Sequence, residues 1–142
     1  MISHFGLCVS NLERSLRFYT HALGFTEKKR LDVSGPIPAK LLGTDELELK
    51  AVFLIDGSTT LELLEYAKPP LTPGATPPRP MAQLGLSHLS FRVSDVLATC
   101  RAIVQDGGTI LGDTRVAGAG GDALFALDPD GTRIEIIGSR KK

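Results

Sequence analysis

The stretch SHFGLCVSN at residues 3–11 returns as SHLSFRVSD at residues 87–95, with Ser-His and Val-Ser at the same places in both copies. A second pattern follows in each copy, because LELL at residues 61–64 corresponds to IEII at residues 134–137. An internal repeat indicates that each copy folds as one structural unit. The sequence therefore predicts two related modules with the same order of elements.

The first copy opens with a strand and a helix. Residues 4–9 predict the strand, and Ser10–Glu13 has the Ser-x-x-Glu spacing of a capping box, which begins a helix. Gly24 stands where a helix takes a left-handed cap, so we expect the helix to end there. The apolar residues between these signals recur at helical spacing: Leu12, Leu16, Tyr19 and Leu23.

Three further strands complete the first copy. They are predicted at residues 25–33, 49–55 and 59–66, where apolar and β-branched residues gather. Asp56-Gly57 is a tight-turn sequence between the last two of them. The first copy is therefore a β-α-β-β-β module.

The second copy repeats this order. A strand is predicted at residues 86–93, and the helix after it stops at Gly107-Gly108. The apolar face of that helix carries Val96, Cys100, Ile103 and Val104. Three more strands are predicted at residues 109–116, 123–127 and 132–137, with a hairpin turn at residues 128–131. Two such modules place the chain in the α+β class.

A proline-rich segment separates the two copies. Residues 67–83 contain six of the nine prolines in the chain. Successive X-Pro steps favour extended conformations and exclude helix, so this segment predicts a semi-rigid linker. We expect a first module at residues 1–66 and a second at residues 84–142, which together make one domain.

The composition excludes several classes of function. The chain has 142 residues, 42% of them apolar, which suits one compact globular domain. Sixteen basic and sixteen acidic residues give a net charge of zero, so we expect no nucleic-acid partner. The basic residues 140–142 predict a solvated chain end rather than a binding site.

No apolar stretch is long enough to span a membrane, and the first residues lack the layout of a signal peptide. We therefore expect a cytoplasmic protein without a membrane partner. Cys8 and Cys100 lack the spacing of a metal site, so the sequence predicts buried, reduced thiols rather than a disulfide.

Each copy carries one histidine early and one glutamate late, His4 with Glu62 and His88 with Glu135. Imidazole and carboxylate are good ligands for divalent Zn, Ni, Co, Fe and Mn. A single histidine on a half-buried strand is more often a hydrogen-bonded core residue, and Glu65 competes with Glu62 as a ligand. Alternation puts Glu65 on the opposite strand face, however, and repetition of the pair in both copies favours a metal site.

Four stretches carry a resemblance to a known family: LERSLRFYTHALGF at 12–25, LELLEY at 61–66, GLSHLSFRVSD at 85–95 and DPDGTRIEI at 128–136. Together they resemble the vicinal oxygen chelate superfamily. Its members include glyoxalase I, methylmalonyl-CoA epimerase, extradiol dioxygenases, fosfomycin resistance enzymes and bleomycin-binding proteins. The resemblance implies that the two modules form an open, cup-shaped mixed sheet with the helices outside. The first and last strands of each module would then lie side by side.

The resemblance also implies a function. One divalent metal (Ni, Co, Zn, Mn or Fe) would be held by His4, Glu62, His88 and Glu135, with two positions left for a small-molecule substrate. The chain would be an isomerase or lyase that stabilises the enolate of a small carbonyl or thioester compound chelated to the metal. Either Glu135 or Glu62 would move the proton, and the sequence does not decide which.

Arg92 lies on the same strand face as His88, so it is a candidate to bind an anionic substrate group, and the alternative is a salt bridge at the rim. Alternation also puts Arg133 on the face of Glu135. The Gly-rich stretch at residues 117–121 predicts a plain loop, with a mobile flap as the alternative.

Two other functions stay open. An iron-dependent extradiol dioxygenase would use His4, His88 and Glu135, although Glu62 would then fill a position that oxygen needs. A non-catalytic binding protein of the bleomycin resistance kind would use the cup for sequestration. We also expect a homodimer, because small sheets leave edges that need cover, and the site could be completed within one chain or between two.

Overall fold

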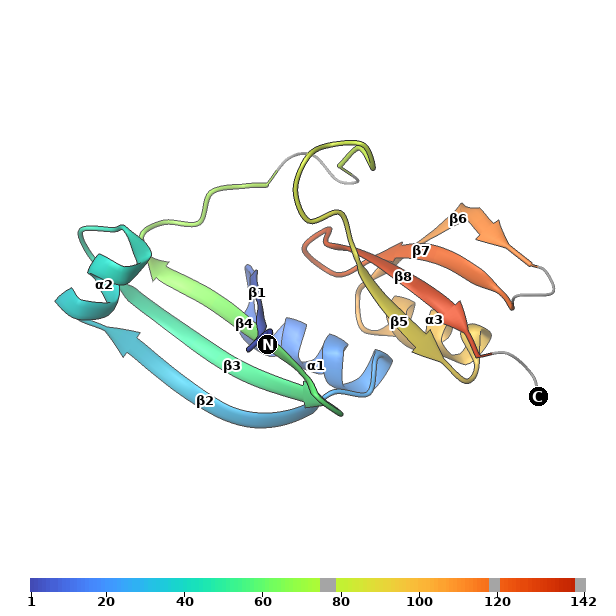
Figure 1. The fold of residues 1–142 in the computed structure, drawn as a ribbon, viewed down its shortest axis with the longest axis horizontal. Coiled ribbons are helices and arrows are strands. Elements are labelled where there is room, and N and C mark those ends of the chain that lie inside the picture. The colour runs from blue at the N-terminus through green and yellow to red at the C-terminus, as the bar shows by residue number, and fades with distance from the viewer. Residues whose placement is uncertain (75–78, 118–120, 140–142) are drawn as a thin grey trace. The chain divides into compact units, whose positions relative to one another are not determined.

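The computed structural model describes residues 1–74, 79–117 and 121–139 (Figure 1). The chain divides into two compact units, Met1–Thr20 with Gly24–Pro73 and His21–Leu23 with Gly74–Lys142. Each unit contains one four-stranded mixed sheet. The α+β class and the two repeated modules are therefore confirmed.

The first module is a sheet in the order β1-β4-β3-β2, in which β1 runs parallel to β4 and the other neighbours are antiparallel. The first and last strands therefore lie side by side, as expected. Its elements are β1 (Phe5–Cys8), α1 (Leu12–Arg17), a π-helical turn (Phe18–Ala22), β2 (Thr26–Ser34), α2 (Pro36–Leu42), β3 (Glu48–Asp56) and β4 (Thr59–Lys68).

The second module repeats this topology in the order β5-β8-β7-β6, with β5 parallel to β8. Its elements are β5 (Leu89–Val93), α3 (Val96–Gln105), β6 (Thr109–Val116), β7 (Ala123–Leu127) and β8 (Arg133–Gly138). β5 begins three residues later than predicted, so His88 precedes the strand just as His4 precedes β1.

Both modules bury one face of the sheet against a helix. In the first, Leu61 and Leu63 of β4 are 2% and 0% exposed, and α1 contacts β3 and β4. In the second, Ile134 and Ile136 of β8 are buried beside Ile103 of α3. Burial of these alternate residues leaves the opposite face of each sheet for Glu62 and Glu135.

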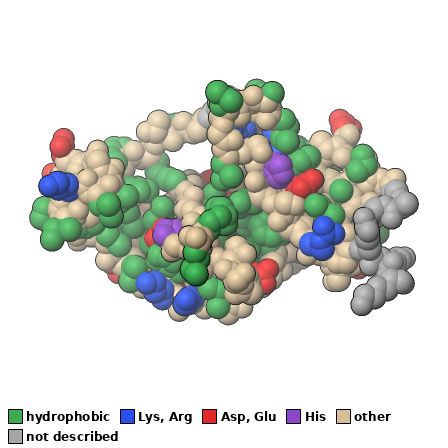
Figure 2. Space-filling model, in the orientation of Figure 1, with side chains coloured by type: hydrophobic (Ala, Val, Ile, Leu, Met, Phe, Trp, Pro, Cys, Tyr) green, Lys and Arg blue, Asp and Glu red, His purple; other side chains and the backbone are tan. Residues whose placement is uncertain are grey.

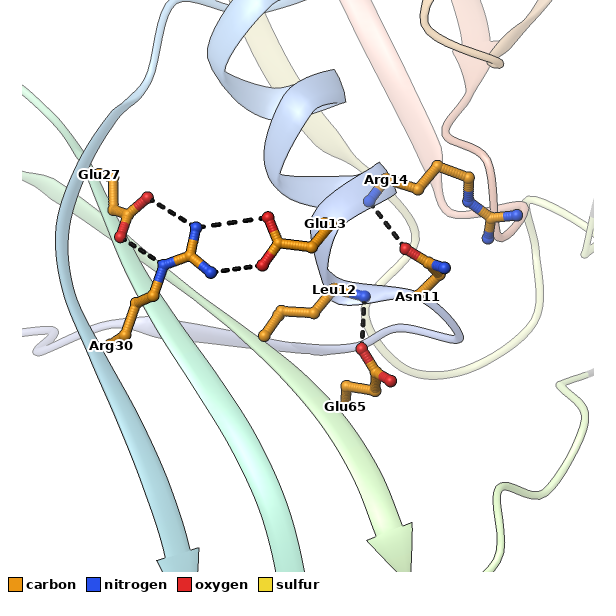
Figure 3. Close-up of polar contacts among 7 residues, drawn as sticks. All are labelled: Asn11, Leu12, Glu13, Arg14, Glu27, Arg30 and Glu65. Atoms are coloured by element: carbon orange, nitrogen blue, oxygen red, sulfur yellow. Dashed lines mark hydrogen bonds and ion pairs between the residues drawn. The ribbon is translucent and has the colours of Figure 1, made fainter.

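The predicted capping box is wrong in one respect. Asn11, not Ser10, caps α1, because its side chain accepts a hydrogen bond from the Arg14 amide at 2.9 Å (Figure 3). Asp95 caps α3 in the same way through the Ala98 amide. Asn11 and Asp95 occupy the same place in the two copies, and each accepts a hydrogen bond from the third amide of its helix. The N-cap is therefore part of the repeat.

The side chain of Glu13 does not turn back to the start of α1. It pairs with Arg30 of β2, which also bonds Glu27 at 2.7 Å (Figure 3). The Arg30 contacts lower the pKa of the Glu27 carboxyl, chiefly through the hydrogen bond. At the far end of the helical segment Gly24 has φ +80°, which confirms the predicted left-handed stop.

Helix α2 was not predicted. Pro36 starts it, which suits a residue without an amide hydrogen, and Gly43 ends it with φ +67°. Ala39 is 3% exposed and packs with Leu49 and Ala51 of β3. Those residues share the sheet face of Glu62, so α2 covers part of that face in the first module.

Other predictions have mixed outcomes. Neither Cys8 nor Cys100 forms a disulfide in the described part of the chain, as expected, but the predicted burial is wrong, because Cys8 is exposed and Cys100 is half-buried. The boundaries predicted for the linker, residues 67–83, stay a prediction, and residues 75–78 lie outside the described part of the chain. The same holds for residues 118–120 of the predicted loop and for residues 140–142. None of the helices in the described ranges is long and apolar enough to cross a membrane.

Candidate functional site

The first module brings His4 to Glu62. Gly6 of β1 pairs with Glu62 of β4, and the parallel register carries His4 to the same end of the sheet. His4 Nε2 lies 3.2 Å from Glu62 Oε2, and the Ser3 hydroxyl lies 3.1 Å from His4 Nδ1. Phe53, which pairs with Glu62 across β3, meets the imidazole edge at a centroid distance of 5.7 Å. Both ring nitrogens of His4 therefore have a polar partner.

The second module repeats this arrangement. His88 Nε2 lies 3.6 Å from Glu135 Oε2, and the Ser87 hydroxyl lies 2.8 Å from His88 Nδ1. Phe125 pairs with Glu135 across β7 and meets the imidazole edge at 5.3 Å. Histidine side chains are visible at the surface in Figure 2, and the side chain of His88 is 27% exposed. The structure thus joins each predicted histidine to the glutamate of its own module.

The donor atoms fit a metal centre. Two ligands bonded to one ion at about 2.1 Å, at right angles, lie about 3 Å apart. The two Nε2–Oε2 distances, 3.2 Å and 3.6 Å, are close to that value. Within the described ranges no third His, Cys, Asp or Glu joins either pair, so each module brings together two candidate ligands.

The serine and phenylalanine contacts were missed from the sequence. Ser3 and Ser87 occupy the same place in the repeat, and a partner at Nδ1 holds a ligating imidazole in one orientation. The repeated Ser-His dipeptide was the signal for this role. Phe53 and Phe125 were harder to find, because their roles depend on the register of the antiparallel pairs.

The two glutamates differ in their surroundings. The Ser90 hydroxyl donates a 2.7 Å hydrogen bond to Glu135 Oε2. Gly6 stands at the corresponding place beside Glu62 and has no side chain. A Cβ built on Gly6 would lie 4.0 Å from Glu62 Oε2, in ordinary contact. The second module therefore restrains its carboxylate with a hydroxyl that the first module lacks.

Glu65 lies on the other side of the sheet from Glu62, as alternation predicted. Its Oε2 accepts a 2.6 Å hydrogen bond from the Leu12 amide at the start of α1 (Figure 3). A carboxylate at a helix N-terminus satisfies a free amide and favours the helix dipole. Glu65 thus has a structural task of its own, away from His4.

Tyr66 and Arg92 are further polar residues on these faces. Burial raises the pKa of the Tyr66 phenol, and negative charge on Cys8 and on Glu62 adds to the rise. Arg92 is exposed on β5, and its Nη1 lies 3.5 Å from the carbonyl oxygen of Gly138. The binding of an anionic group by Arg92 stays a prediction.

Comparison with known proteins places these observations in a family. The sequence profile of the Glyoxalase/Bleomycin resistance protein/Dioxygenase superfamily matches residues 1–136. The chain is 30% identical to a lactoylglutathione lyase of Haemophilus influenzae, over 96% of this chain and 90% of that protein.

Solved structures show the same fold. A glyoxalase family protein from Bacillus cereus superimposes with a TM-score of 0.87 at 17% identity, over 99% of this chain and 94% of that one. A genomically encoded fosfomycin resistance protein from Listeria monocytogenes gives a TM-score of 0.63 at 14% identity, over 98% and 93%. At these identities the likeness concerns the fold alone.

Proposed function

Because the chain belongs to the Glyoxalase/Bleomycin resistance protein/Dioxygenase superfamily, we propose that it is a divalent-metal-dependent isomerase or lyase for small carbonyl or thioester compounds. The observation that carries the proposal is the His-Glu pair in each module, with its imidazole oriented by a serine. A hydrogen-bonded core histidine would account for one such pair, but the same pair in both modules favours a pair of metal ligands.

The proposed centre takes its ligands from both modules: His4, Glu62, His88 and Glu135. A divalent metal supplies Lewis acidity, which polarises a carbonyl group and acidifies the neighbouring C–H bond. Imidazole and carboxylate suit Ni, Co, Zn, Mn and Fe alike, so metal analysis identifies the ion.

The carboxylates have a second task in this proposal. Glu62 or Glu135 accepts the proton from the carbon beside the carbonyl and returns it to a neighbouring atom. Phe53 and Phe125 lie against the imidazoles, so they exclude water from one side of each ring. Arg92, exposed on β5, is the candidate that the sequence offers for contact with a negatively charged part of the substrate.

A metal analysis followed by a substrate screen tests the proposal. The purified protein should contain about one divalent metal ion for each set of four ligands. The protein loaded with that metal should catalyse the reaction. The reaction in the name of the Haemophilus relative, with lactoylglutathione, is the first to assay, followed by epimerisation of a 2-substituted acyl thioester. Iron with catechol ring cleavage would favour the dioxygenase instead. Tight binding of small molecules without turnover would favour the binding protein.

The proposed assembly is a homodimer, and light scattering checks it. A mass near 15.2 kDa across micromolar concentrations would contradict the dimer. Mixing two variants then tests whether the two His-Glu pairs of one metal site come from the same chain. A chain carrying His4→Ala and a chain carrying His88→Ala should regain metal when mixed if sites are shared between subunits. Mixed chains that stay empty would assign each site to a single chain.

A further inference from the structure

The second module contains a buried arginine without a counter-charge. Arg133 begins β8 on the face of Glu135 and is 8% exposed. Its guanidinium carbon lies 5.9 Å from the centre of the Phe125 ring. In the described part of the chain, its Nη1 has no hydrogen-bond partner and its guanidinium forms no ion pair.

This isolation is costly. A guanidinium always carries its charge, and the burial of Nη1 without a partner costs this nitrogen its hydrogen bonds to water. Contact with one aromatic ring replaces only a small part of that loss. Arg115 of β6 shows the ordinary arrangement, because it is 44% exposed and still pairs with Asp122 at 2.8 Å. Arg133 therefore needs a negatively charged partner, and the described residues of the module do not provide one.

The nearest carboxylate on that face is already engaged. Glu135 follows Arg133 by two residues, about 7 Å along a strand. Its Oε2 accepts from the Ser90 hydroxyl and lies 3.6 Å from His88 Nε2. The Phe125 ring that contacts Arg133 also contacts His88, so the arginine stands beside the proposed metal ligands.

The carboxylates of Glu62 and Glu135 would balance the charge of a divalent metal, so the positive charge of Arg133 beside them would still lack an anion. We propose that Arg133 binds an oxyanion group of the substrate, a carboxylate or a phosphate, whose neighbouring oxygens reach the metal centre. This inference rests on the proposed function and names the substrate class. The planar fork of the guanidinium can donate two parallel hydrogen bonds to either oxyanion.

Two matched probes test it by binding rather than by turnover. Butyrohydroxamate and succinomonohydroxamate chelate metals through the same group and have the same chain length, but only the second ends in a carboxylate. Calorimetry with the metal-loaded wild type should show at least about tenfold tighter binding of succinomonohydroxamate. Competition by inorganic phosphate or by acetate then tells which oxyanion Arg133 prefers.

Variants assign that preference to one residue. Arg133→Met should abolish the difference between the two probes while butyrohydroxamate binding is retained, and Arg133→Lys should keep part of it. Arg101→Met, on the exposed side of α3, is the matched control. Thermal melting of Arg133→Met should show no loss of stability, because removal of an unpaired buried charge relieves a cost.

The failures are distinguishable. A preparation that takes up no metal and binds neither probe would overturn the proposed function together with this inference. Equal binding of both probes to the metal-loaded wild type would overturn the inference alone. Loss of the preference in Arg92→Met but not in Arg133→Met would move the oxyanion contact to Arg92 and overturn it as well.

Discussion

The first module holds its glutamate beside one histidine, whereas the second holds its glutamate between a histidine and a serine. The modules differ elsewhere too. The first has the longer strand β3, nine residues against five in β7, and adds α2 on the face of Glu62. The second has the exposed Arg92 and the buried Arg133 on the face of Glu135.

The repeat preserves some side chains of the candidate site and varies others. Serine, histidine, glutamate and phenylalanine keep their places in both modules. The histidine and the glutamate form the candidate metal-binding pair, and the serine and the phenylalanine contact the histidine. The surrounding side chains have diverged. The first module adds α2 and Lys29, whose Nζ lies 4.7 Å from the centre of the Phe53 ring. The second adds the Ser90 hydroxyl and the guanidinium groups of Arg92 and Arg133. The faces of Glu62 and Glu135 therefore carry different side chains around the same pair.

The largest expected effect is loss of the metal from either module. His4→Ala and His88→Ala should each remove bound metal and turnover, because each pair supplies half of the ligands in the proposed centre. The proteins should stay folded, since a partly exposed imidazole leaves no sealed cavity. Metal analysis beside a thermal melt measures both properties. Full metal content in one of the two variants would show that its module takes no part.

Glu62→Gln and Glu135→Gln refine this test, because an amide keeps the shape but removes the charge. Both should weaken metal binding, and the glutamate that moves the proton should lose turnover that added metal does not restore. Glu46→Gln is a suitable control, since Glu46 is 74% exposed and pairs only at the surface with Lys68. If none of these ligand variants changes metal content, the metal centre is wrong.

A smaller effect should follow from exchange of the residue beside each glutamate. Ser90→Ala removes the hydroxyl that holds Glu135, so metal affinity should fall by about tenfold. Gly6→Ser should strengthen metal binding, because its side chain has room beside Glu62. Titration with a competing chelator measures both affinities. Unchanged affinity in Ser90→Ala would mean that the hydrogen bond does not position the carboxylate.

The smallest effect concerns stability alone. Glu65→Gln weakens the bond to the Leu12 amide and should lower the free energy of unfolding by about 1 kcal/mol. Metal content should not change, since Glu65 lies on the opposite sheet face from Glu62. Urea denaturation provides the measurement, with Glu46→Gln again as the control. Loss of metal in Glu65→Gln would contradict the register of β4.

Much of this arrangement could be predicted because the sequence repeats. Alternation in short strands placed Glu62 and Glu65 on opposite faces, and the copies in the second module supported the assignment. Local propensity was less informative. Helix α2 begins with Pro-Ile-Pro, which alone indicates an extended segment, and it forms because Ala39 packs on β3.

The contacts of Ser90, Phe125 and Arg133 depend on which strands pair and in what register. Ser90 meets Glu135 across a parallel pair, and Phe125 meets His88 through an antiparallel neighbour. Spacing along the chain does not encode such distances. The missing partner of Arg133 is likewise visible only in three dimensions, because it is defined by what surrounds the side chain.

The parallel pairing of β1 with β4 also sets an order of folding. β2, β3 and β4 can assemble through consecutive antiparallel connections, but β1 must wait until the last strand of its module has been synthesised. Its four residues then add at the sheet edge, and a long loop closes as they do so. We therefore expect His4 to reach Glu62 late in folding, and a metal held by both would fasten the chain's first strand to the sheet.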